Sequence, residues 1–212
     1  MFSVIFDMDG TLLDTQSISI PAWNYAGSLQ GIENAGAHIE KVCGMNEAGW
    51  SSYLTEQFKN MDIVAFKKAA WQYIGENLVI KYKGGIKELL DFLKQNGIKI
   101  ALASGTDRKK VLYSLNQVGA TDYFSAIVGG NEVENGKPAP DIFLHTASLL
   151  GVNPEDCIVF EDSKNGILAA KAAGLRVIGI PDVARFDAET KKLLLAELSS
   201  ADKAIEILKK MI

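Results

Sequence analysis

The chain has 212 residues, 48% of them hydrophobic, with 26 acidic and 22 basic side chains and a net charge of −4. A chain without a basic excess is poorly suited to nucleic acid or to an anionic membrane, so we expect neither as a partner. Two cysteines and two histidines are too few and too scattered for a zinc site. The length suits one α/β domain with a second domain inserted into it.

The sequence also bears on location. Its first residues form an apolar segment with no basic stretch before it, and no apolar run approaches the roughly 18 residues of a membrane span. We therefore expect a cytoplasmic protein. We also expect a monomer whose partner is a small molecule.

Residues 2–6 predict an apolar first strand, and two acids, Asp7 and Asp9, follow it. Residues two apart in an extended chain point to the same side, so both carboxylates can face one pocket. Two such charges about 4 Å apart repel by roughly 4 kcal/mol at an effective dielectric of about 20. The pair therefore indicates a cation, and Mg2+ is suited because it bridges carboxylates to a phosphate. The alternative to a cation site is a surface turn, in which residues 7–10 only cap the strand.

Residues 15–83 predict a helical insertion. They contain all three tryptophans and no convincing strand, and apolar side chains between Phe58 and Tyr73 recur at the three-and-four spacing of one amphipathic helix. An insertion directly after the strand that bears the acids would cover the pocket and exclude water from it. The alternative is a helical subdomain without a gating role.

From residue 84 onward, helical segments alternate with short apolar strands, which is typical of a parallel sheet covered on both faces. We therefore predict a Rossmann-like, doubly wound α/β core domain of residues 1–14 and 84–212, with a helical cap domain of residues 15–83. Strands are expected at 98–103, 126–128, 157–160 and 176–180, and helices at 86–95, 108–117, 140–150, 163–173, 188–198 and 201–211.

Polar residues follow several of these strands. Ser104 and Gly105 come after the second strand, Lys137 lies in a loop stiffened by prolines, and Glu161 and Asp162 come after the fourth strand. Each group alone is compatible with a turn, a helix cap or a surface loop. Ligands of such sheets bind beyond the carboxyl ends of the strands, so we expect these residues to meet Asp7 and Asp9.

With these residues assembled, the chain resembles the haloacid dehalogenase-like superfamily, in the capped branch that contains beta-phosphoglucomutase and sugar-phosphate phosphatases. The resemblance spans the whole chain and is carried by four motifs in order, 7–11 (DMDGT), 102–105 (LASG), 137–143 (KPAPDIF) and 159–163 (VFEDS) with its continuation to Gly174.

The resemblance implies a role for each residue. Asp7 would be the nucleophile that forms an aspartyl-phosphate, and Asp9 the general acid and base. Ser104, the Gly105 amide and Lys137 would hold the phosphoryl oxygens, which makes Ser104 and Lys137 catalytic as well. Mg2+, the implied cofactor, would be bound by Asp7, the backbone carbonyl of Asp9, Asp162 and Glu161, the last directly or through water. Thr15 would lie at the hinge to the cap.

Several chemistries share this family. A halide leaves without a proton, so an acid at Asp9 argues against dehalogenation. Where the mutase carries a histidine and an arginine in its cap, this chain is expected to place Ser19 and Glu47, and Glu47 would repel a second phosphate. We therefore expect a Mg2+-dependent hydrolase of a small phosphorylated metabolite, such as a sugar or polyol phosphate. A phosphosugar mutase is the alternative, followed by a non-catalytic phosphate-binding protein.

Overall fold

The structure is a computed structural model in which residues 2–77 and 79–212 are described. Within these residues, six parallel strands form one sheet in the order β3-β2-β1-β4-β5-β6. The predicted α/β class and the parallel sheet are confirmed. The strands are β1 Ser3–Phe6, β2 Ile100–Ala103, β3 Ala126–Val128, β4 Cys157–Glu161, β5 Arg176–Gly179 and β6 Ala196–Glu197.

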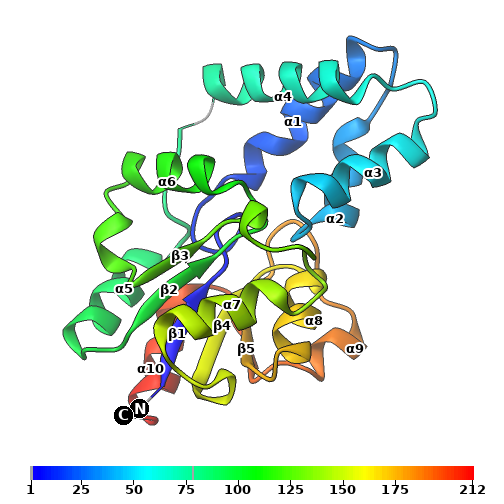
Figure 1. Cartoon of the computed structure of the whole chain (residues 1–212). Helices are drawn as coiled ribbons and strands as arrows, with labels where there is room; N and C mark the ends of the chain where they lie inside the picture. Colours follow the sequence, from blue (N-terminus) through cyan, green and yellow to red (C-terminus); the bar gives the residue numbers. More distant parts are fainter. Residues whose placement is uncertain (1, 78) are drawn as a thin grey trace.

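Helices cover both faces of the sheet (Figure 1). Successive strand residues point to opposite faces, so Val4 and Phe6 of β1 pack in one hydrophobic cluster while Ile5 packs in the other. The first cluster contains side chains from α5 Ile86–Gln95, α6 Arg108–Gln117 and α10 Ala204–Lys209. The second contains side chains from α7 Asp141–Leu150 and α8 Lys164–Ala172, with α9 Ala188–Lys191 beside α8.

Among the described residues, four α-helices between β1 and α5 form what we call the helical unit, which lies beyond the carboxyl ends of the strands in Figure 1. It has a hydrophobic cluster of its own, built around Trp23, Leu54 and Phe66. The boundaries expected for a cap domain, 15 and 83, remain a prediction. The helices are α1 Gln16–Ser28, α2 Ile39–Val42, α3 Glu47–Gln57 and α4 Ile63–Asn77.

The helix expected between Phe58 and Tyr73 is interrupted, and this prediction is wrong at its start. Phe58 is the C-terminal cap residue of α3, and α4 begins only at Ile63. The carboxylate of Asp62 accepts hydrogen bonds from the backbone N–H groups of Val64 and Ala65, both at 3.0 Å. This is an N-terminal helix cap, which the apolar spacing alone does not reveal.

The predicted tail is also partly wrong. Only α9 is helical within 188–198, and Ala196–Glu197 forms strand β6 beside β5. Residues 201–211 divide into a short 3-10 helix, Ala201–Lys203, and α10. Further 3-10 helices lie at Ala35–His38, Thr121–Tyr123, Gly130–Glu132 and Pro154–Asp156. In the described part of the chain, no helix has the length and apolarity needed to cross a membrane.

Candidate active site

The ends of three adjacent strands place the predicted site residues side by side. Phe6 of β1 pairs with Leu102 of β2 and with Phe160 of β4, so the chain leaves these strands at one level of the sheet. Asp7 comes next after β1 and Glu161 is the last residue of β4. The order of the strands reverses around β1, which is where ligands bind in sheets of this kind.

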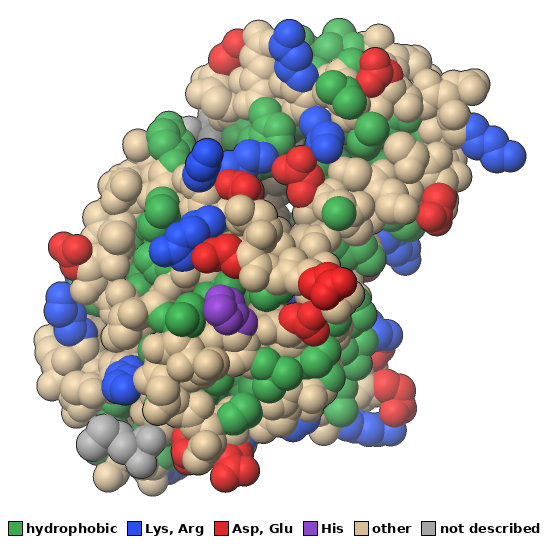
Figure 2. Space-filling view, viewed as in Figure 1, with side chains coloured by type: hydrophobic (Ala, Val, Ile, Leu, Met, Phe, Trp, Pro, Cys, Tyr) green, Lys and Arg blue, Asp and Glu red, His purple; other side chains and the backbone are tan. Residues whose placement is uncertain are grey.

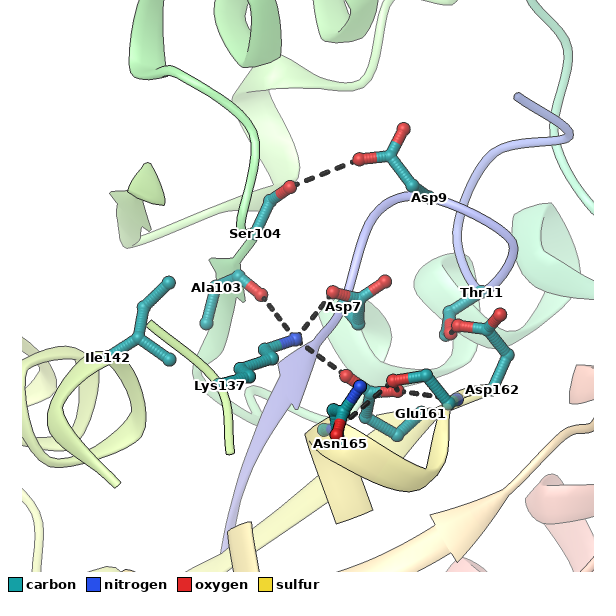
Figure 3. Close-up of polar contacts among 12 residues, drawn as sticks. Asp7, Asp9, Thr11, Ala103, Ser104, Lys137, Ile142, Glu161, Asp162 and Asn165 are labelled. Atoms are coloured by element: carbon teal, nitrogen blue, oxygen red, sulfur yellow. Dashed lines mark hydrogen bonds and ion pairs between the residues drawn. The ribbon is translucent and has the colours of Figure 1, made fainter. Parts of the chain in front are cut away.

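Lys137 is the cation of this site. Its side chain is fully buried, and its Nζ donates to Asp7 Oδ1 at 2.6 Å and to Glu161 Oε1 at 2.5 Å (Figure 3). A third, longer contact of 3.4 Å joins Nζ to the carbonyl oxygen of Ala103. Burial acts to lower the pKa of Lys137, but the charges of Asp7 and Glu161 outweigh it and hold this pKa above its usual value. The ammonium group is therefore charged and fixed between two carboxylates.

Three carboxylates gather around this lysine. Asp7, Glu161 and Asp162 are buried, and each offers an oxygen within 4.8 Å of the others. Burial is the main cause that raises the pKa of Asp7 well above its usual value, with Glu161 and Asp9 adding to it against the opposing charge of Lys137. Burial and the charges of Glu161 and Asp7 likewise raise the pKa of Asp162. One lysine does not balance the three acids, and their oxygen donors fit Mg2+.

Asp162 is oriented by two side chains. Thr11 Oγ1 donates to Asp162 Oδ1 at 2.9 Å, and Gln16 Nε2 donates to Asp162 Oδ2, also at 2.9 Å. The same Gln16 Nε2 donates to the backbone carbonyl oxygen of Asp9 at 2.8 Å. Gly10 has a φ of +88° and a Cβ there would meet Asp162 and Gln16 at 2.5 Å, so only glycine fits this turn.

The side chain of Asp9 lies apart from these three acids. Its Oδ1 accepts a hydrogen bond from Thr15 Oγ1 at 2.6 Å, while its Oδ2 accepts from Ser104 Oγ at 3.2 Å and Thr106 Oγ1 at 2.8 Å (Figure 3 shows the Ser104 contact). Both Asp7 and Asp9 line the same pocket, which has a volume of about 150 Å3. Two neighbouring acids therefore have different surroundings, one paired with a lysine and one held by hydroxyl groups.

Ser104 and Gly105 follow β2, as predicted. Ser104 is fully buried, and its Oγ accepts a hydrogen bond from the backbone N–H of Thr106 at 3.1 Å. A Cβ on Gly105 would lie 2.8 Å from the carbonyl oxygen of Met45, so glycine permits the helical unit to approach this turn closely. Gly105 thus lies where the pocket meets the helical unit, and Ser104 lies buried beside it.

The helical unit closes the pocket from the opposite side. The walls there include aromatic side chains, Trp23, Trp50 and Trp71, together with Lys67. Asn165 Nδ2 of α8 donates to the carbonyl oxygen of Cys43 at 2.9 Å, which fixes one point of contact between the unit and the core. The pocket therefore combines a charged floor with a largely apolar roof that includes three tryptophans.

Glu47 and Ser19, which we compared with the mutase cap, lie near this roof. Ser19 lines the pocket and its hydroxyl donates to the carbonyl oxygen of Thr15 at 3.0 Å. Glu47 pairs at 3.1 Å with Lys67 of α4 and at 3.1 Å with Lys110 of α6. Burial acts to raise the pKa of Glu47, but the two lysines outweigh it and lower this pKa. Two positive charges thus offset Glu47, and the expected repulsion of a second phosphate remains a prediction.

Figure 2 shows basic and acidic side chains gathered where the helical unit meets the core. At this junction, the Nζ of Lys110 lies 3.7 Å from the ring centre of Trp71 in α4, in the geometry of a cation–π contact. A lysine of the core thus contacts two helices of the helical unit. Sequence reasoning missed this lysine and Gln16, because neither belongs to a motif and both residue types are common on helices.

Comparison with known proteins places the chain among enzymes that act on phosphate esters. The profile of the family described as haloacid dehalogenase-like hydrolase matches residues 4–180. A phosphorylated carbohydrates phosphatase of Thermotoga maritima is 35% identical over 85% of this chain and 85% of its own length. A beta-phosphoglucomutase of Bacillus subtilis is 31% identical over 85% and 83%. The crystal structure of a beta-phosphoglucomutase from Clostridium difficile superposes with a TM-score of 0.83 at 28% identity, covering 99% of this chain and 96% of that one.

Proposed function

The chain belongs to the haloacid dehalogenase-like hydrolases, and from this premise we propose that it is a Mg2+-dependent phosphatase of a small phosphorylated carbohydrate. The observation that carries the proposal is the contact of Asp7 with Lys137 at 2.6 Å, at the floor of a pocket that Asp9 also lines. The similarity to a phosphorylated carbohydrates phosphatase, at 35% identity, supports the substrate class.

In this proposal Asp7 is the nucleophile. An oxygen of its carboxylate forms a bond to phosphorus while the bond from phosphorus to the sugar oxygen breaks, which leaves an aspartyl-phosphate. Lys137, which already contacts Asp7 Oδ1, binds a phosphoryl oxygen and offsets the charge that develops there. The backbone N–H of Gly105 and the Ser104 hydroxyl, at the end of β2, complete the phosphoryl site.

Asp9 supplies and removes protons. Protonated at first, it donates to the sugar oxygen as the bond to phosphorus breaks, and its carboxylate then accepts a proton from the water that attacks the aspartyl-phosphate. The three hydroxyl groups of Thr15, Ser104 and Thr106 hold its side chain toward the pocket.

The buried acids hold the metal. Asp7, Asp162 and the Asp9 carbonyl are the proposed ligands of Mg2+, with Glu161 bound directly or through water, and the clustered oxygens of the three carboxylates support this assignment. When bound, Mg2+ neutralises negative charge on the phosphoryl group and on Asp7. Burial and neighbouring negative charges raise the pKa of Asp7 and of Asp162, so a bound cation would favour the ionised forms that serve as nucleophile and metal ligand.

The test is phosphate release from p-nitrophenyl phosphate and from a panel of phosphorylated sugars, with Mg2+ and with a chelator. We expect turnover only with Mg2+, and we expect Asp7→Asn to abolish it by about 10^4-fold or more, since the loss of a nucleophile removes the covalent route. Thermal unfolding of the variant checks that the fold is intact. Full turnover in the chelator, or by Asp7→Asn, contradicts the proposal.

A phosphosugar mutase is the second candidate, because the chain is 31% identical to the Bacillus subtilis beta-phosphoglucomutase and the charge of Glu47 is offset by two lysines. The two candidates differ in what attacks the aspartyl-phosphate, water or a sugar hydroxyl. Phosphorus NMR of beta-glucose 1-phosphate turnover separates them. Inorganic phosphate as the product supports the phosphatase, whereas glucose 6-phosphate supports the mutase.

A further inference from the structure

Gln16 is a buried polar residue at the site to which the proposed chemistry assigns no role. It is the first residue of α1, its side chain reaches down to the core, and the residue is only 6% exposed. The two hydrogens of its Nε2 satisfy two oxygens at once, the Asp9 carbonyl oxygen at 2.8 Å and Asp162 Oδ2 at 2.9 Å. A buried amide with both hydrogens used in this way is firmly placed.

These two oxygens are also proposed ligands of Mg2+. An amide N–H presents a partial positive charge to an oxygen, as a cation does, so the Gln16 amide and a cation are attracted to the same place. They also repel each other there, because the N–H dipoles point their positive ends at any ion held between the oxygens. The amide therefore stabilises the metal-free site in the way that a cation stabilises the loaded one.

The amide oxygen of Gln16 fixes the orientation of the amide group. Gln16 Oε1 faces Cys43, whose Sγ donates to it at 3.4 Å. If the amide were turned over, Oε1 would face two acceptor oxygens and the Asp162 hydrogen bond would be lost. A Cβ at Gly10 would lie 2.5 Å from both Asp162 Oδ2 and Gln16 Nε2, so Gly10 packs closely against the amide and leaves it little room beside these oxygens.

From these contacts we propose that Gln16 is a positioning residue that competes with the divalent cation. In the metal-free protein its Nε2 occupies the place between the Asp9 carbonyl and Asp162, and it gives up both hydrogen bonds when a cation binds. The affinity for Mg2+ is therefore set partly by the stability of these two hydrogen bonds. The inference rests on the metal site of the proposed function, and it concerns a residue outside the proposed ligands.

A purely structural role predicts the opposite result. If Gln16 only holds Asp162 in place for the cation, its removal loosens a ligand and weakens the binding of Mg2+. If it competes with the cation, its removal strengthens binding, because no hydrogen bonds need to be broken first. The direction of the change in Kd therefore distinguishes the two roles.

The experiment is a calorimetric titration of the metal-free protein with Mg2+ alone. The test variants are Gln16→Met, which keeps the length of the side chain without its N–H groups, and Gln16→Ala. The control is Gln57→Met, at an exposed glutamine that ends α3. Thermal unfolding in chelator confirms that each variant is folded before it is titrated.

We expect the Kd for Mg2+ to fall about tenfold in Gln16→Met and Gln16→Ala, since hydrogen bonds to a charged group are among the stronger ones in proteins. The Kd of the Gln57→Met variant should equal that of the original chain. An unchanged or higher Kd in both Gln16 variants overturns the inference and leaves the proposed phosphatase standing. Absence of Mg2+ binding in the original chain and in all variants contradicts both.

Discussion

The core and the helical unit are built differently, and the difference separates the groups that react from the pocket wall that chooses the substrate. In the core, parallel strands in fixed register end beside one another, and the residues that follow them are buried and paired at 2.5–2.6 Å around Lys137. The helical unit has a hydrophobic cluster of its own and contacts the core through a few polar groups, such as Cys43 and Glu47. The core therefore fixes the reacting groups, while the unit can change its pocket wall without moving them.

The change expected to have the largest effect on catalysis is Asp9→Asn in the core, which tests whether the core holds the reacting groups. We expect kcat to fall about 10^2-fold to 10^4-fold with sugar phosphates, because the leaving oxygen receives no proton. The loss should be smaller with p-nitrophenyl phosphate, whose leaving group departs without one. Steady-state kinetics with both substrates measures this, with Asp122→Asn, at an exposed acid, as the control. An equal loss with both substrates would argue against the acid role.

The next test asks whether the helical unit unfolds by itself. Phe66 is fully buried in its cluster, and Phe66→Ala should reduce the free energy of unfolding by about 3–5 kcal/mol. All three tryptophans lie in this unit, so their fluorescence reports on it, while far-UV circular dichroism reports on the whole chain. We expect the fluorescence transition in urea to move further than the dichroism transition.

A matched change in the core sharpens that result. Leu89 of α5 is also fully buried, and Leu89→Ala should move the dichroism transition instead. If both probes shift together in both variants, the two regions unfold as one cooperative unit and the energetic part of the comparison is wrong.

A smaller effect is expected at the contact between the regions. Lys110 of α6 pairs with Glu47 and lies over Trp71, and both contacts are partly exposed. Lys110→Met should raise KM about threefold to tenfold and leave kcat nearly unchanged, since a weak ion pair and a cation–π contact help to hold the pocket wall against the core. Lys109→Met, at the exposed neighbouring position, is the control. A fall in kcat without a change in KM would place Lys110 in the chemistry instead.

The smallest effect concerns the stability of the core itself. The pKa of Asp162 in the folded chain lies above its ordinary value of 3.8, so its ionised form is disfavoured by folding at neutral pH. Asp162→Asn should therefore raise the Tm of the metal-free protein by about 2–4 °C near pH 7, for a gain of about 1 kcal/mol. The difference should vanish as the pH falls below 3.8, where the unfolded acid is protonated as well. A lower Tm at pH 7 would show that the hydrogen bonds of Asp162 outweigh its charge.

The same division explains how far the sequence could predict the molecule. Short apolar runs in the sequence locate the strands, and the polar residues that follow them locate the strand ends. Because the carboxyl ends of parallel strands meet at one edge of the sheet, Asp7, Ser104 and Glu161 are expected to lie together, which agrees with the register of β1 with its neighbours. The roles of these residues remain predictions. The helix start at Ile63 and strand β6 were missed, because a capping aspartate and a two-residue edge strand leave little periodicity.

The contacts between the regions were beyond sequence reasoning for a different reason. Gln16, Lys67 and Lys110 belong to separate helices, and their partners are set by how the helical unit sits on the core. No local pattern encodes that placement. The sequence shows that residue 47 is an acid, but it does not show that Lys67 and Lys110 surround Glu47. These two lysines influence how Glu47 acts on a substrate.

The two glycines at the junction have a consequence for how this architecture can diversify. Gly105 of the core faces the carbonyl of Met45, and Gly44 of the helical unit, at a φ of +80°, faces the Ser163 hydroxyl so closely that a Cβ would collide with it. At Gly105 the two regions therefore meet main chain against main chain, and at Gly44 the main chain meets a small hydroxyl side chain. Contacts made at glycines depend little on the larger side chains that line the cavity, so mutation can change the cavity wall, and with it the substrates accepted, while these two contacts are kept.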